Sequence, residues 1–314
     1  MARSGSIGID VGGTKCLGVA IDESGSVVAE HRVATPEGGE AVLEAVAGVA
    51  RALGCGTDVP IGVGMPGLVT ADGVLAFAAN LAGVADLPVR ALLEEHLGGV
   101  RVTVDNDANC AAWAEHRLGA ARGYDDVVMA TLGTGIGGGI VVGGRLVRGA
   151  HGFGGEMGHM VVDPAGPECP CGNRGCWERF ASGDAFGRMG REAAVGGRAP
   201  HLVELAGGDP HAVQGHHVGL AAAGGDEVSL ELVGRFAWWL ALGLANLANL
   251  LDPERFVIGG GVVEMGDLLL VPARSAFGRL LQGAGHRPEV PIVAAVMGEH
   301  AGAVGAALLG AAAR

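Results

Sequence analysis

The chain has 314 residues, enough for about two domains if a domain takes roughly 150 residues. Its 34 acidic and 21 basic side chains give a formal net charge of −13, which argues against a nucleic-acid-binding face because such a face needs an excess of positive charge. Hydrophobic residues make up 49% of the chain and charged residues 18%, so the composition predicts a folded protein and excludes an intrinsically disordered one.

The apolar composition raises the question of a membrane span. The most apolar stretch, residues 236–251, is shorter than the ~20 residues that a span needs. It also contains Asn246 and Asn249, so it predicts a buried helix. Residues 1–10 lack the apolar region of a signal peptide, so we expect a cytoplasmic protein. In that compartment the six cysteines are expected to be reduced: Cys16, Cys55, Cys110, Cys169, Cys171 and Cys176.

The first half of the chain alternates strand and helix patterns. Residues 6–34 predict a strand, a glycine loop, a second strand, a turn at 22–25 and a third strand. A helical pattern follows at about 40–53, and a strand at 61–65 ends at Pro66 and Gly67. Residues 100–104 predict a strand that leads into a helix ending near residue 118.

The opening pattern recurs at residues 125–149, with Gly133 in the place of Gly12, 121 residues later. This repeat predicts a duplicated domain. Residues 190–230 are rich in Gly, His and Ala and predict helices joined by exposed loops, with histidines such as His216 at the surface. A strand within residues 251–262 ends in three glycines, and a helix is expected from about residue 299.

The first motif that indicates chemistry covers residues 10–15. A strand ends in Asp10, and Gly12 and Gly13 allow a ligand to approach the backbone closely. Thr14 adds a hydroxyl, and Lys15 is the only lysine in the chain. This set suits a phosphate bound to Mg²⁺. The alternative is an ordinary β-turn.

The second motif is the glycine run at residues 133–139. It matches G-x-G-x-x-G, but a strand follows it where a dinucleotide-binding site requires a helix. The sequence also lacks G-x-x-x-x-G-K-[ST], which excludes a Walker-type site. A glycine-rich hairpin resembling the one at Gly12 indicates instead that the two loops act together on the phosphates of one nucleotide.

The third motif is Asp-Asn-Asp-Ala-Asn at residues 105–109, where a strand meets a helix. Asp and Asn commonly cap helices, so at least one of these residues is expected to do so. Two carboxylates and two amides exceed what a cap needs. A carboxylate here could accept the proton of a hydroxyl that attacks a phosphate.

The fourth motif combines His159 with Cys169, Cys171 and Cys176. Three thiols and one imidazole make the ligand set of a closed structural zinc site. The alternatives are buried cysteines without a metal, or a redox pair of Cys169 and Cys171. Zinc binding would also bring together the flanking Glu156 and Glu178, and paired carboxylates suit the vicinal hydroxyls of a sugar.

Six segments together carry a family resemblance: DVGGTK at 10–15, GMPG at 64–67, DNDAN at 105–109, LGTGIGGG at 132–139, GGEMGH at 154–159 and CPCGNRGCWE at 169–178. In order and spacing they resemble the ROK family, and within it the zinc-containing bacterial glucokinases. The resemblance implies an α/β fold of the actin/hexokinase (ribonuclease H-like) type, with duplicated domains and a cleft between them. We expect a small domain at 1–110, joined by a helix at about 299–314, and a large domain with the zinc site at 111–298.

The resemblance also implies ATP-dependent phosphorylation of D-glucose with Mg²⁺, Asp107 being the general base. The sugar-binding residues would be Gly67, Asn80, Asn106, Asp107, Glu156, His159 and Glu178. The phosphates, Mg²⁺ and the nucleoside would meet Asp10, Gly12, Gly13, Thr14, Lys15, Thr134, Gly135, Gly260 and Gly261. Zn²⁺ would be held by His159, Cys169, Cys171 and Cys176. Partners would be a sugar, a nucleotide and further copies of the chain in a dimer or tetramer, without nucleic acid or membrane.

One departure leaves the sugar open. After Asn80 and Leu81 such kinases often carry an aromatic residue, whereas this chain has Ala82, Gly83 and Val84. The alternatives are a kinase for another hexose or an N-acetylhexosamine (N-acetylmannosamine, mannose or fructose), and a zinc-stabilised sugar sensor without activity. Some family members are repressors with an N-terminal helix-turn-helix, for which a strand starting at about residue 6 leaves no room. Asp107 and the intact 10–15 loop favour the enzyme.

Overall fold

The computed structural model describes residues 5–78, 81 and 83–313. Two five-stranded mixed sheets with helices confirm the predicted α/β class. The contacts divide the chain into two compact units. Unit 1 comprises 1–127, 139–155 and 296–314, and unit 2 comprises 128–138 and 156–295. The domain limits at 110 and 298 stay a prediction, but the contacts place 111–127 and 139–155 in unit 1.

The sheet of unit 1 has the strand order β3-β2-β1-β4-β8. Its strands are β1 (Ser6–Val11), β2 (Lys15–Ile21), β3 (Val27–Ala34), β4 (Ile61–Met65) and β8 (Val102–Asn106). The first three form the predicted antiparallel meander, and β4 and β8 continue the sheet in parallel with β1. Asp10 therefore lies near the end of β1, and Asn106 ends β8.

Helices cover both faces of this sheet. Ile7, Ile9 and Val11 of β1 join a core with α1 (Gly39–Ala52) and α2 (Val89–His96). Leu17 and Val19 of β2 join a second cluster with α3 (Asp107–Arg117) and α10 (Ala301–Ala312). The alternation of side chains along a strand separates these two sets of core residues.

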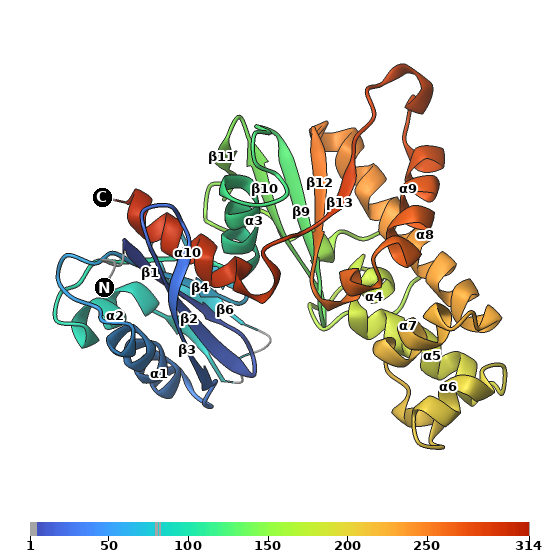
Figure 1. Cartoon of the computed structure of the whole chain (residues 1–314), viewed down its shortest axis with the longest axis horizontal. Coiled ribbons are helices and arrows are strands. Elements are labelled where there is room, and N and C mark those ends of the chain that lie inside the picture. Colours follow the sequence, from blue (N-terminus) through green and yellow to red (C-terminus); the bar gives the residue numbers. More distant parts are fainter. Residues whose placement is uncertain (1–4, 79–80, 82, 314) are drawn as a thin grey trace. The chain divides into compact units, whose positions relative to one another are not determined.

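Helix α10 lies directly against β1 and β4 although almost 300 residues separate it from β1 (Figure 1). A Cβ at Gly8 would be 1.9 Å from the Ala303 oxygen, and one at Gly62 would be 1.8 Å from the Ala306 oxygen. A Cβ at Gly305 would likewise be 1.7 Å from the Cys110 oxygen of α3. The glycines and alanines here allow backbones to touch, which accounts for the Ala-rich composition of this helix.

A small antiparallel sheet in unit 1 has the order β5-β6-β7: β5 (Leu68–Val69), β6 (Leu75–Phe77) and β7 (Ala85–Leu87). These strands were not expected from the sequence, because two or three residues are too few to show an alternating pattern. Two positions singled out from the sequence, Asn80 and Ala82, lie outside the described residues.

The second sheet has the order β11-β10-β9-β12-β13. Its strands are β9 (Val127–Leu132), β10 (Ile136–Val142), β11 (Arg145–Leu146), β12 (Arg255–Gly259) and β13 (Ile292–Ala294). The predicted strands and glycine turns of 125–149 are confirmed. The predicted helices of 190–230 are α5 (Gly183–Val195), α6 (Pro200–Leu205) and α7 (Gly215–Ala223). Unit 2 also contains α4 (Glu178–Ala181) and α9 (Asp267–Leu280). Short 3₁₀ turns of unit 2 lie at Met157–His159, Pro210–Ala212, Gly261–Met265 and Ala284–His286, and one of unit 1 lies at Gly298–His300.

The long apolar helix α8 (Glu227–Leu251) is a core element of unit 2. By length and composition alone it could cross a membrane, but 56% of its most apolar window is buried within the protein. A Cβ at Gly243 would be 2.0 Å from the Trp177 ring, and Trp177 Nε1 donates to the Trp239 oxygen at 2.8 Å. The predicted buried helix at 236–251 is confirmed, and it begins earlier, at Glu227.

Candidate active site and metal centre

The junction of β8 and α3 presents the carboxylate predicted to be the general base. Asn106 is the helix cap: its Oδ1 accepts a hydrogen bond from the Asn109 N–H at 3.0 Å, and its Nδ2 donates to the Gly67 oxygen at 3.0 Å. Asp107 is the first helical residue, and its Oδ1 accepts from the Ala108 N–H at 2.8 Å. The expectation that one of these residues caps the helix is confirmed, and the cap is not Asp107.

Asp10 and Asp107, both in unit 1, are close enough for their negative charges to repel each other. Space for the Asp10 carboxyl depends on Gly302, since a Cβ there would be 2.6 Å from Asp10 Cγ. Desolvation and the charge of Asp107 raise the pKa of Asp10 to about 7, against the opposing effect of Lys15. Two carboxylates that disfavour each other's charge form a place where a divalent cation is stabilising.

The loop after Asp10 is a tight hairpin turn, in which the Gly12 N–H donates to the Lys15 oxygen at 2.8 Å. Gly13 and Thr14 are exposed at its tip. Lys15 Nζ forms an ion pair of 2.7 Å with Glu299, a residue just before α10, and Glu299 also pairs with Arg32 at 3.0 Å. The backbone here forms a tight turn, as the alternative interpretation expected. The role of the loop in phosphate binding stays a prediction.

A cavity of about 1000 Å³ in unit 2 contains part of the predicted nucleotide site. Thr134 and Gly261 line it together with Gly133. Gly260 has a φ of 84°, and a Cβ there would be 2.4 Å from the Leu132 oxygen, so this turn requires glycine. The volume is at the upper end of small-molecule sites, about 300–1,000 Å³.

The same cavity has lining residues that the sequence analysis did not identify. They include Arg191, Gln214, Leu220 and Glu264 from α5, α7 and the turns around them. His216 is exposed, as expected, and it also lines the cavity. No motif marks these positions, because they meet only after separate helices pack together.

The four predicted zinc ligands form one cluster in unit 2. Their donor atoms all lie within 4.8 Å of one another. Cys171 Sγ is 3.6 Å from Cys176 Sγ, and Cys169 Sγ is 3.8 Å from His159 Nδ1. Ligands placed tetrahedrally at zinc distances of 2.0–2.3 Å are about 3.5–3.8 Å apart. All six cysteines are free thiols, and this donor set fits structural zinc.

The cluster also positions the acidic side chains around it. Glu178 Oε1 accepts from the Cys169 thiol at 3.0 Å and is 3.7 Å from His159 Nδ1. A Cβ at Gly135 would be 2.6 Å from Glu178 Oε2, so this glycine makes room for the carboxylate. Glu156 is close enough to His159 and Glu178 to interact electrostatically with both. The predicted grouping of these three residues is therefore present within unit 2.

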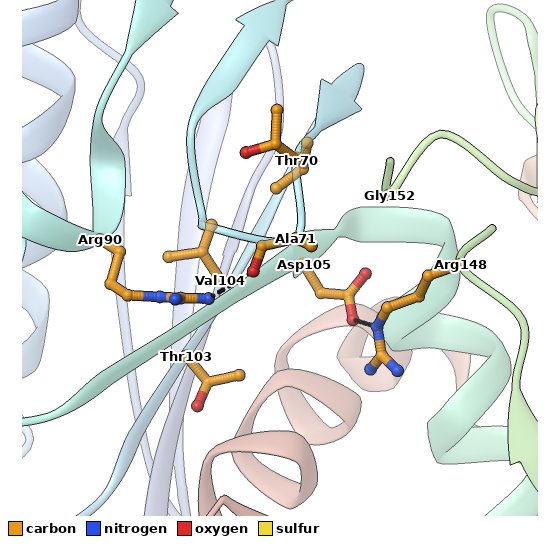
Figure 2. A pocket seen from close by; sticks show the side chains of 9 residues that line it. Thr70, Ala71, Arg90, Thr103, Val104, Asp105, Arg148 and Gly152 are labelled. Carbon is orange, nitrogen blue, oxygen red and sulfur yellow. Dashed lines mark hydrogen bonds and ion pairs between the residues drawn. The ribbon is translucent and has the colours of Figure 1, made fainter. Parts of the chain in front are cut away.

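A second, smaller cavity of about 210 Å³ lies in unit 1 beside Asp105 (Figure 2). Asp105 Oδ2 accepts from Arg148 Nε at 2.6 Å. Asp105 belongs to the motif at 105–109, but Arg148 belongs to none of the motifs. Arg148 lies 43 positions from Asp105, and nothing in the pattern of the chain indicates the pair.

Comparisons with known proteins place the chain in a family. The model of the ROK family matches residues 6–313. The chain is 40% identical to a glucokinase of Streptomyces coelicolor over 96% of both chains, and 35% identical to an N-acetylmannosamine kinase of Escherichia fergusonii over 97% of both. It also resembles the crystal structure of a ROK family glucokinase from Streptomyces griseus in complex with glucose and AMPPNP, with a TM-score of 0.87 and 41% identity over 97% of this chain and 98% of that one. The chain therefore belongs to the ROK family.

Proposed function

We propose that the protein is an ATP:hexose 6-phosphotransferase that converts D-glucose into glucose 6-phosphate. The observation that carries this proposal is the 40% identity to a glucokinase over nearly the whole chain. The Streptomyces griseus relative, which was crystallised with glucose and an ATP analogue, supports the same substrates. The roles in the reaction are divided between residues of the two units.

Asp107 is the general base in this proposal. The 6-hydroxyl oxygen attacks the γ-phosphorus, its proton passes to the Asp107 carboxylate, and the bond from phosphorus to the bridging oxygen of ADP breaks. The helix cap is provided by Asn106, so the proposed base does not have that role. When Mg²⁺ is bound it neutralises charge on the phosphates, and Asp10 would hold it, through water.

Three residues of unit 2 bind the sugar in this proposal. Glu156 and Glu178 accept hydrogen bonds from its hydroxyls, and His159 presents Nε2 to it because Nδ1 faces the cysteine sulfurs. Zn²⁺ would be held by His159 and the three cysteines and would fix the loop that bears Glu178. A fourth protein ligand leaves zinc no open position, so its part is structural. The other assigned sugar contacts are Gly67, Asn80, Asn106 and Asp107 of unit 1.

The nucleotide occupies the large cavity of unit 2 in this proposal. Thr134 and Gly135 meet the phosphates, and Gly260 and Gly261 lie by the adenosine. The turn formed by Gly12, Gly13, Thr14 and Lys15 acts on the phosphates with Mg²⁺. Lys15 would exchange its partner Glu299 for a phosphate oxygen. Breaking the ion pair costs little free energy because the pair is solvent-exposed. We also propose a cytoplasmic homo-oligomer.

A coupled assay of ADP release tests the proposal, with glucose, mannose, fructose and N-acetylmannosamine offered separately. We expect the highest kcat/KM with glucose. Preference for N-acetylmannosamine would favour the second candidate, which the 35% identity to an N-acetylmannosamine kinase supports. Sugar binding in calorimetry without ADP release would contradict the enzyme and leave a sugar sensor.

A further inference from the structure

A buried carboxylate that the proposed chemistry does not use lies one residue before the helix cap. The side chain of Asp105 is only 7% exposed, and a buried charge is costly unless it is paired. Its Oδ2 accepts from Arg148 Nε at 2.6 Å, and Figure 2 shows the guanidinium beside the carboxylate. The chain therefore pairs a buried carboxylate, next to Asn106 and Asp107, with a partly exposed arginine.

The other oxygen of Asp105 holds the beginning of α3. Oδ1 accepts from the Asn106 backbone N–H at 2.8 Å and from Asn109 Nδ2 at 3.0 Å. Asn106 in turn accepts from the Asn109 N–H and donates to the Gly67 oxygen. The residues on both sides of Asp107 are thus connected to one carboxylate, which restricts the direction of the first helical turn.

Arg148 connects this carboxylate to the segment that leads to Glu156. The Arg148 oxygen accepts from the Gly154 N–H at 2.8 Å, which closes residues 148–154 into a turn. A Cβ at Gly152 would be 2.4 Å from the Val69 oxygen, so the turn packs tightly on β5. Because Arg148 Nε is bound to a carboxylate, the position of this turn is restricted.

We propose that Asp105 and Arg148 form a positioning pair, which fixes the N-terminus of α3 so that Asp107 meets the attacking hydroxyl in a productive orientation. This inference rests on the proposed function. A misplacement of about 1 Å at a reacting group can cost about 100-fold in rate, so a pair that touches no substrate can still control kcat.

The pair also sets the charge around Asp107. The other titratable groups close by are Asp10 of β1, Cys110 of α3, and Lys15 through Asp10. The first turn of α10 has no ionisable side chain, and Glu299 and His300 just before it are paired with Lys15 and Glu30. Removing the charge of Asp105 leaves the positive Arg148, which favours ionised Asp107. Removing Arg148 leaves a negative Asp105, which disfavours it.

The experiment compares Asp105→Asn, Arg148→Met and Arg148→Lys with the wild type in steady-state kinetics between pH 5 and 9. Arg51→Met is the matched control, because it removes an exposed ion pair with Glu44 elsewhere in unit 1. Asp105→Asn should fold, since its amide can bond to Asn109 Oδ1, which has no partner among the described residues. An amide has only one acceptor oxygen, however, so this variant must give up Asn106 N–H or Arg148 Nε.

We expect kcat to fall about 10- to 100-fold in Asp105→Asn and Arg148→Met, with a smaller change in KM. The acid limb of the kcat/KM profile should move to lower pH in Asp105→Asn and to higher pH in Arg148→Met. Arg148→Lys retains the charge without the Nε donor, so its limb should stay in place while kcat remains low. A wild-type kcat in Asp105→Asn and Arg148→Met would overturn the inference. So would acid limbs of kcat/KM that move in the same direction in these two variants.

Hydrogen exchange separates this inference from the proposed function. Amides in the peptide covering residues 105–112 should exchange faster in Asp105→Asn and Arg148→Met than in the wild type or Arg51→Met. If the wild type released no ADP with any sugar, the proposed function would fail. The exchange data would then decide alone: faster exchange supports the positioning pair, and unchanged exchange contradicts it.

Discussion

The start of α3 and the cysteine cluster are both candidate functional regions, but they are held together differently. At α3, Asp105, Asn106 and Asn109 are connected by hydrogen bonds of their side chains and backbone N–H groups. In the cluster, three thiols and an imidazole gather around one point and contact one another weakly. Burial raises the pKa of the Cys169 and Cys176 thiols, so thiolates there need a cation. The first region is organised by the polypeptide itself, and we propose that the second depends on an ion.

The largest expected effect concerns Asp107 in the self-organised region. Asp107→Asn retains size and hydrogen bonding but cannot accept the hydroxyl proton. General-base catalysis is worth about 10²–10⁴-fold, so we expect kcat to fall by at least that range while the glucose Kd changes much less. Steady-state kinetics and glucose titration calorimetry measure the two quantities. Turnover within a few-fold of the wild type would show that the carboxylate is not the base.

Loss of one ligand of the cysteine cluster should lower metal content, Tm and glucose affinity together. Cys171→Ser should abolish binding of about one Zn²⁺ per chain in elemental analysis. We expect Tm to fall by about 5–10 °C, since a domain of this size loses about 2–4 °C per kcal/mol. Glucose binding should weaken with it, because in the proposed function the metal fixes the loop of Glu178. Cys55→Ser, at a half-buried thiol in unit 1, is the control and should retain metal, Tm and affinity. A metal-free variant with normal melting and activity would disprove the dependence on zinc.

Substitution of Glu178 should change the glucose Kd more than kcat, the opposite of the result expected for Asp107. Its Oε1 contacts Cys169 and lies near His159, and Glu178→Gln replaces one carboxylate oxygen by an amide donor. We expect the glucose Kd to rise about 10-fold, because a hydrogen bond to a charged group contributes about 1.5–3 kcal/mol. The kcat at saturating glucose should fall less than in Asp107→Asn. Glu204→Gln, at an exposed position on α6, should leave both quantities unchanged. An unchanged Kd in Glu178→Gln would remove this residue from the sugar site.

The smallest expected effect is on the stability of unit 1. We expect substitution of Asp10 to raise this stability while it lowers activity. The pKa of Asp10 rises from 3.8 to about 7 on folding, so the folded state holds a proton that the unfolded state has lost between about pH 4 and 7. Wild-type stability therefore falls as pH rises through this window, and the full penalty applies above pH 7. Asp10→Asn removes the penalty and should be more stable than the wild type by about 1–3 kcal/mol at pH 8.

The difference between Asp10→Asn and the wild type should vanish below about pH 4, where the wild-type carboxyl is protonated in both states. Urea unfolding at pH 4, 6 and 8 measures it, without nucleotide or added Mg²⁺. The same variant should lose most of its kinase activity, because an amide is a poor partner for Mg²⁺. A stability difference independent of pH would contradict the proposed electrostatic cost at Asp10.

The sequence by itself determined the α/β class, the two glycine hairpins, the junction at residues 105–109 and the ligand set of the cluster. These features are local: strand alternation, glycine turns and the C-x-C-x₄-C spacing each extend over a few residues and need no distant partner. The residues of the cluster were identified correctly because His159 is only ten positions from Cys169.

Only the tertiary structure decided which residue caps α3, where α10 packs and which side chains line the large cavity. The cap depends on whether β8 ends at Asn106 or one residue earlier, a register that the pairing with β4 sets. Lys15 and Glu299, like Asp105 and Arg148, meet across long sequence separations, and Arg191 and His216 reach one cavity from different helices. Such contacts follow from the packing of whole elements, whose energy is summed over many residues and leaves no signature at the positions that meet.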